Sequence, residues 1–190
     1  IAHSPDRPEQ EPQTMQEHLR QVAKLSAACF DDPFLKDMAR LQALFHDAGK
    51  YKPDVQRHLR GETAQKFDHA TLGARLLSDR LPKPFRYLAA APMMGHHGGM
   101  PDCHSGLGDA AGRSVDLRLA DEPPADAMLA FEGEMPECAS AALPSGRPPI
   151  CSAKTATMEL FLLSRLLHSA LVDADALDTL RYYKGELPRT

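Results

Sequence analysis

The sequence predicts an all-α domain in which helices pack on helices around a long helix near the C-terminus. Of its 190 residues, 43% are hydrophobic, Leu and Ala are prominent, and there is no Trp. Apolar residues recur every three or four positions in several segments, which is the periodicity of a helix that buries one face. At this length we expect residues 1–190 to form a single domain with its own core.

Composition and charge exclude several classes of protein. The sequence contains no apolar stretch long and pure enough to cross a bilayer, and its start lacks a signal-peptide pattern. The four Cys form no CxxC pair, so reduced thiols and a cytoplasmic location are expected. The net charge of −4 argues against a broad basic surface for duplex DNA. It leaves a nuclease open, because bound divalent ions reverse the charge of an acidic site.

The first helix is expected to follow a polar lead-in. Residues 1–13 are polar and contain Pro, which predicts an extended segment. Thr14 and Glu17 have the spacing of a capping box, so a helix should begin there. His18 takes a position on the apolar stripe of this helix. It is therefore either a core residue with a satisfied hydrogen bond or a ligand.

The second helix is expected to deliver an adjacent His and Asp to its C-terminal end. Asp32 can serve as its N-cap, with Pro at the first helical position. The apolar run LQALFHDAGK, residues 41–50, ends with His46 and Asp47, then Gly and Lys50. An imidazole and a carboxylate side by side at a buried helix end are unfavourable unless a metal ion or another group compensates them. The dipeptide alone does not decide between such a site and an ordinary polar helix end.

The middle of the chain supplies a further His at the start of a helix. After a short helix at about 53–60, Asp68 can cap a third main helix that has His69 in its first turn. Gly73 is a poor helix former, which indicates a close approach between two helices at this position.

Two adjacent His occur where the next helix should end. This helix begins at Pro84 and runs to GHHGGMPD, residues 95–102. A helix end that opens into Gly-rich backbone can direct both His96 and His97 toward one centre. The alternative is that both are solvated in a polar loop.

The C-terminal third should contain an insertion followed by the central helix. Residues 103–152 are rich in Gly, Pro and Ala, which predicts an irregular insertion with one helical patch near Asp126 to Phe131. Residues 154–183 predict a long helix that is apolar nearly throughout as far as Val172. Asp173 is expected on its buried face, where a carboxylate needs a cationic partner or a metal. Asp175 and Asp178 are expected on other faces.

Together these residues predict a metal centre. The candidate metal ligands are His18, His46, Asp47, His69, His96, His97 and Asp173. They are too many for one ion and suit two ions that share a carboxylate. Their imidazole content favours Mn, Fe, Co, Ni or Zn over Mg. The expected chemistry is hydrolysis by a metal-bound water that attacks phosphorus, with Lys50 near a phosphate oxygen or the developing charge.

In this order the motifs resemble the HD nuclease domain of the CRISPR-associated nuclease-helicase of type I systems, within the HD superfamily of metal-dependent phosphohydrolases. The phrases that carry the resemblance are EHL (17–19), LFHDAGKYKPDVQRHL (44–59), DHATLGA (68–74), GHHGGMPD (95–102) and SALVDADALDT (169–179). They cover most of the chain except residues 1–13 and 103–152. HDxGKY, HHGG and LVDAD in combination distinguish this family from general HD phosphohydrolases.

The resemblance implies an all-α HD-domain helical bundle that cuts single-stranded DNA with two divalent transition-metal ions, Mn, Ni, Co or Fe before Mg or Zn. The expected ligands of the first ion are His18, His46, Asp47 and Asp173, and those of the second are Asp47, His69, His96 and His97, with Lys50 beside the site. The implied partners are a superfamily 2 helicase, in cis or in trans, and the RNA-guided surveillance complex. Residues 184–190 would then suit a linker to the helicase, and the domain is expected to be a monomer.

Two other functions fit the same ligands. The first is an HD phosphohydrolase that acts on nucleotides or cyclic dinucleotides, which the ligand set alone does not exclude. The second is a docking module without catalysis, which the complete ligand set disfavours.

Overall fold

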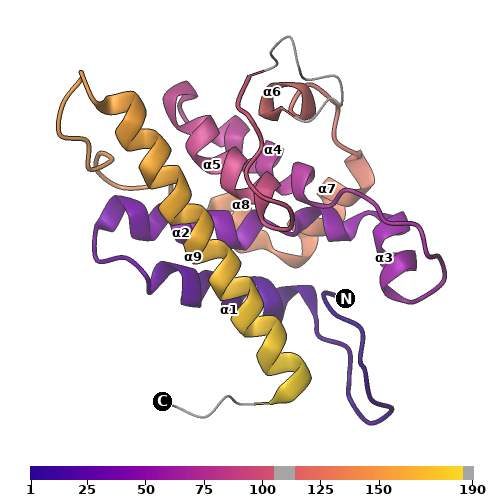
Figure 1. Cartoon of the computed structure of the whole chain (residues 1–190). Helices are drawn as coiled ribbons and strands as arrows, with labels where there is room; N and C mark the ends of the chain where they lie inside the picture. Colours follow the sequence, from indigo (N-terminus) through magenta and orange to yellow (C-terminus); the bar gives the residue numbers. More distant parts are fainter. Residues whose placement is uncertain (105–113, 186–190) are drawn as a thin grey trace.

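The computed structural model describes residues 1–104 and 114–185, and within them the fold is all-α, as predicted (Figure 1). The helices, in order, are α1 (Met15–Ala27), α2 (Pro33–Phe45), the 3-10 helix η1 (Ala48–Tyr51), α3 (Pro53–Leu59), α4 (Ala70–Arg80), α5 (Lys83–Gly95), α6 (Val115–Arg118), α7 (Ala125–Glu134), α8 (Pro136–Ser140) and α9 (Ala156–Lys184). None of these helices is long and apolar enough to span a bilayer.

The first two helices begin where their capping residues predict. The Thr14 side chain accepts a hydrogen bond from the Glu17 backbone, and the Glu17 carboxylate accepts one from the Thr14 backbone, which completes the capping box. The Asp32 side chain accepts a hydrogen bond from the backbone of Leu35, and Pro33 is at the first helical position. These caps determine where the two helices begin, one of which carries His18 and the other of which leads to the His46–Asp47 pair.

Two glycines bring the start of α4 against the end of α2. A Cβ atom on Gly73 would collide with the backbone carbonyl of Phe45, and a Cβ on Gly49 would collide with the backbone of His69. The Gly49 amide instead donates a hydrogen bond of 3.1 Å to the His69 carbonyl. The close helix approach predicted from Gly73 is confirmed, and it places His69 beside Asp47.

The long helix α9 crosses α1, α2 and α5 and closes the bundle on one side (Figure 1). Its buried stripe contains Leu167, Leu171, Ala174 and Asp178, whereas Leu166 and Leu177 are exposed. The inward position predicted for Asp173 is therefore wrong, because Asp173 lies on the exposed face. The first two-thirds of α9 are apolar on every side, so the periodicity could not identify the packed face.

The stretch 103–152, predicted to be irregular apart from a helical patch near residues 126–131, is only partly so: within the described residues it contains α6, α7 and α8. Helices α7 and α8 pack on the bundle, and Phe131, Cys138 and the intervening Met135 join the core, each at most 1% exposed. The remainder of the prediction for this stretch includes residues 105–113, which lie outside the described residues. So does most of the expected linker, at residues 186–190.

The lead-in is also more ordered than an extended arm. Residues 1–13 double back on themselves, with an antiparallel bridge between His3 and Gln13. Ala2 is fully buried, and the segment lies beside the C-terminal turns of α9, where Gln10 donates a hydrogen bond of 2.6 Å to the Tyr182 carbonyl. This N-terminal hairpin, defined as residues 1–13, covers one side of the predicted site.

Candidate metal centre

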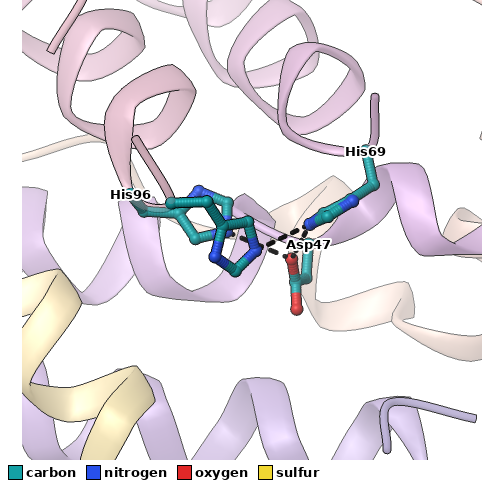
Figure 2. A group of neighbouring side chains, drawn as sticks. Asp47, His69 and His96 are labelled. Atoms are coloured by element: carbon teal, nitrogen blue, oxygen red, sulfur yellow. Dashed lines mark hydrogen bonds and ion pairs between the residues drawn. The ribbon is translucent and has the colours of Figure 1, made fainter. Parts of the chain in front are cut away.

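Asp47 lies at the centre of a cluster of imidazoles contributed by five parts of the chain. It follows the last turn of α2 at the start of η1, and its side chain is 1% exposed. Figure 2 shows its carboxylate with His69 and His96 directed toward it from above. The two carboxylate oxygens face two different groups of residues, so the centre has two halves.

The Oδ2 half brings together side chains from α1, α2 and α9. The Nε2 atom of His18 lies 3.3 Å from Asp47 Oδ2 and 3.4 Å from Asp175 Oδ1. The Nε2 atom of His46 lies 3.5 Å and 3.9 Å from the same two oxygens. Atoms bound to one ion at about 2.0–2.2 Å lie roughly 3.0–3.5 Å apart. The spacings within His18, His46 and Asp47 fit a single shared metal ion, and Asp175 fits as a further ligand through its 3.4 Å approach to His18, although its oxygen lies further from His46.

The Oδ1 half is formed by the start of α4 and the end of α5. Asp47 Oδ1 lies 3.6 Å from His69 Nε2 and 3.5 Å from His96 Nε2. His97 completes this half, since its Nε2 atom is 2.8 Å from that of His69. The ligand atoms of Asp47, His69, His96 and His97 all lie within 4.8 Å of one another, which makes this half a second candidate for an ion.

Hydrogen bonds on the outer ring nitrogens orient the imidazoles. His46 Nδ1 is 2.7 Å from the Ala43 carbonyl, and His96 Nδ1 is 2.6 Å from the Met93 carbonyl. A carbonyl only accepts, so Nδ1 of each ring carries the proton, and a neutral ring then has an Nε2 lone pair facing Asp47. His18 Nδ1 has an equivalent partner in Asp178 Oδ2, at 2.7 Å. Such outer hydrogen bonds are typical of metal-binding His.

Several inner atoms of this cluster are buried and make no hydrogen bond. They are Nε2 of His18, His46 and His96, and the carboxylate oxygens of Asp47, of which Oδ2 has the Lys50 ammonium as an ion-pair partner. Buried polar atoms without partners are unfavourable by about 1–3 kcal/mol each. Metal ions in the two halves would satisfy these atoms, and the donor set of imidazoles with a shared carboxylate fits that role.

The electrostatics of the centre favour added positive charge. Burial alone would raise the pKa of Asp47, but Lys50 and the surrounding imidazoles lower it well below its usual range. Burial lowers the pKa of His18, yet hydrogen bonds to Asp178 and Asp47 raise it overall to about 9. Protons on imidazoles thus supply positive charge near Asp47 that a metal would otherwise supply, and metal binding would release them.

The pKa values of His97 and His69 are shifted downward, in the opposite direction from that of His18. Burial and the neighbouring His96 lower the pKa of His97 to about 4, and burial also lowers that of His69. Both are therefore neutral near pH 7, which is the form that binds a metal. His97 is exposed and His69 is half-buried, so the centre opens to solvent on this side.

Six of the seven predicted metal ligands lie together in the structure. The cluster contains His18, His46, Asp47, His69, His96 and His97. Asp173 lies outside it, and Asp175, one half-turn further along α9, takes its place beside His18 and His46. The Lys50 ammonium is 2.6 Å from Asp47 Oδ2 and its side chain is 7% exposed. It therefore supports Asp47 from inside the protein.

Sequence reasoning missed Asp175, Asp178 and His3 as neighbours of the site. Asp175 and Asp178 follow the buried stripe of α9 through Leu171 and Ala174, but choosing that stripe required knowledge of which helices pack on it. His3 lies in a segment without helical periodicity, so no sequence signal pointed to it.

The comparisons with known proteins agree with this geometry. The family model of the HD domain matches residues 15–128, which is more than half of the chain. The chain belongs to the HD domain family. The match extends from the helix that carries His18 through the His46–Asp47 pair, His69, and the His96–His97 pair. No curated protein matches the chain. Family membership and the His/Asp cluster together indicate a metal-dependent hydrolase.

Proposed function

We propose that this HD domain is a metal-dependent nuclease that cleaves single-stranded DNA in type I CRISPR interference. The observation that carries the proposal is the position of Asp47, whose two oxygens face two separate groups of imidazoles. A carboxylate shared in this way suits a pair of divalent ions, which is a common arrangement in enzymes that hydrolyse phosphodiesters. The preference for DNA rests on the sequence resemblance described above.

Two groups of side chains would each hold one ion. His18, His46, Asp47 and Asp175 would hold one ion, and Asp47, His69, His96 and His97 the other. Ions bound there would lower the pKa of a coordinated water and neutralise phosphoryl oxygens. Asp178 and the backbone carbonyls of α2 and α5 keep the imidazoles oriented.

Lys50 has a positioning role in this proposal. Its ammonium is paired with Asp47 and also donates a hydrogen bond of 3.3 Å to the Ala2 carbonyl. Because it is buried, it holds the Asp47 carboxylate in place and does not reach a phosphate at the surface.

The substrate would approach from the side on which His97 is exposed. The loop after His97 borders a hollow lined by Gly99, Met100, Arg165 and His168. Arg165 is exposed on α9 and offers a cation to a phosphate backbone there. A single strand fits this arrangement better than a broad duplex surface, since the protein has a net negative charge.

The partners and location follow from the same resemblance. A superfamily 2 helicase, in cis or in trans, would supply the single strand, and the RNA-guided surveillance complex would select the DNA. The domain would act in the cytoplasm.

A substrate panel tests the proposal. Chelated protein is supplied with Mn, Ni, Co, Mg or Zn singly and mixed with circular single-stranded DNA, duplex DNA, nucleoside phosphates or a cyclic dinucleotide, with Asp47→Ala as control. Cutting of the single-stranded circle by the wild type, lost in Asp47→Ala, supports a nuclease and shows internal cleavage because a circle has no ends. Turnover of nucleotides or cyclic dinucleotides with intact DNA supports the other HD activity and refutes the nuclease.

A further inference from the structure

The N-terminal hairpin, residues 1–13, is held in place by backbone hydrogen bonds. The Ala2 amide donates a bond of 2.8 Å to the Gln13 carbonyl, and the Gln13 amide donates one of 3.2 Å to the His3 carbonyl. Ala2 is fully buried and belongs to the hydrophobic core. The hairpin is therefore packed as part of the folded domain.

Two connections join the hairpin to the metal centre. The Ala2 carbonyl accepts a hydrogen bond from Lys50, whose ammonium is paired with Asp47. The Gln13 side chain donates a bond of 2.8 Å to Asp178 Oδ2, the same oxygen that is 2.7 Å from His18 Nδ1. The hairpin thus contacts the groups that orient Asp47 and His18.

His3 extends from this hairpin toward the centre. Its ring lies perpendicular to that of His18, with the centroids 4.9 Å apart. The possible ligand atoms of His3, His18 and Asp175 all lie within 4.8 Å of one another. Ligands on opposite sides of one ion are about 4.2 Å apart, so a small shift of the hairpin brings these atoms into range of one ion.

The surroundings of His3 favour a ligand. Thr179 Oγ1 lies 3.3 Å from its Nε2 atom, and the Tyr182 ring stacks against it at 5.9 Å, so the imidazole is held in one place.

We propose that His3 is an additional imidazole ligand of the ion held by His18 and Asp175, so that the N-terminal hairpin forms one wall of the metal centre. The inference rests on the metal centre of the proposed function but not on its substrate. It lies outside the stretch matched by the HD domain family, which begins at residue 15. The half of the centre that contains His18 and Asp175 would then be completed by residues 1–13, which show neither helical periodicity nor a recognised motif.

Metal binding without DNA tests the assignment. Chelated wild type, His3→Ala and the control His104→Ala are titrated with Mn²⁺, and free Mn²⁺ is measured by its electron paramagnetic resonance signal. His104 is an imidazole with 72% of its side chain exposed, paired with Asp116 away from the centre. We expect His3→Ala to weaken one class of Mn²⁺ site by at least about tenfold and to leave the other class unchanged. The control should match the wild type.

Co²⁺ absorption and a second variant separate ligation from packing. Loss of an imidazole ligand changes the visible Co²⁺ bands, so His3→Ala should alter the spectrum of the wild type. His3→Gln keeps a polar side chain near Thr179 but has no imidazole. If His3→Gln restores wild-type affinity and spectrum, or if His3→Ala changes neither, the assignment is refuted. If the wild type binds metal through His3 yet cuts no DNA, the nuclease proposal fails and the ligand assignment stands.

Discussion

Replacement of Asp175 by Asn distinguishes the observed metal centre from the one expected from periodicity. Both residues are Asp on α9, but Asp175 faces His18 and His46 whereas Asp173 is exposed. Asp173→Asn is therefore a matched control on the same helix. We expect Asp175→Asn to weaken metal binding and Asp173→Asn to leave it unchanged.

The magnitude follows from the number of atoms in this half of the centre. Asp175 Oδ1 is one of four converging atoms, and it lies 3.4 Å from His18 Nε2. Loss of even an outer partner weakens a metal site by about 10–100-fold, so loss of an inner carboxylate should weaken it by at least about tenfold, or ~1.4 kcal/mol. With metal at 100 times the wild-type Kd, stabilisation of the folded state should fall from about 2.7 to about 1.4 kcal/mol.

Urea unfolding with and without Mn²⁺ measures this difference. The free energy of unfolding gained on adding Mn²⁺ should be smaller in Asp175→Asn by about 1.3 kcal/mol or more. The same gain in Asp173→Asn and wild type is the expected control result. Equal gains in all three proteins, or a loss confined to Asp173→Asn, would refute the placement of Asp175 in the centre.

Three further predictions concern the packing that positions the site. Phe131→Ala should lower the free energy of unfolding by about 3–5 kcal/mol in a denaturant titration, because the ring is fully buried; a loss below about 1 kcal/mol would show that α7 does not belong to the core. Gly73→Ala should destabilise the fold by about 1–3 kcal/mol through its collision with the Phe45 carbonyl. Gly133→Ala, where a Cβ meets nothing within 4 Å, should instead stabilise it by about 0.5–1 kcal/mol, and equal effects at the two glycines would contradict the close approach. Asp178→Asn should weaken Mn²⁺ binding by about 10–100-fold in a direct titration, because it removes the charged partner of His18; unchanged affinity would mean that Asp178 does not orient that ring.

Local signals predicted much of the fold and part of the cluster. The capping box at Thr14 and the cap at Asp32 have short-range physical causes, so they were visible in the sequence and appear in the structure. The apolar run that ends at His46 and Asp47 determined where that pair would lie. Gly73 predicted a close contact because Gly destabilises a helix interior, and a close approach of another backbone explains its presence there.

The remainder depended on tertiary contacts that periodicity does not encode. Helix α9 carries apolar residues on every side, so Asp173 and Asp175 could not be ranked without knowing that α1, α2 and α5 pack on one stripe. A helical patch was predicted where α7 lies, but its packing on the core was missed because Phe131 is the single large apolar side chain buried there, among Gly and Glu residues. His3 was missed because its position depends on backbone pairing with Gln13, ten residues further along a polar segment that has no helical pattern.

The most direct test of the central claim is the number of ions bound on either side of Asp47. Chelated protein is titrated with Mn²⁺, and the stoichiometry and affinities are compared with those of Asp47→Asn. The proposed centre predicts two ions per chain in the wild type and weakened binding of both in Asp47→Asn, because both of its oxygens face ligands. A single ion in the wild type, or two ions bound with unchanged affinity in Asp47→Asn, would contradict a shared carboxylate.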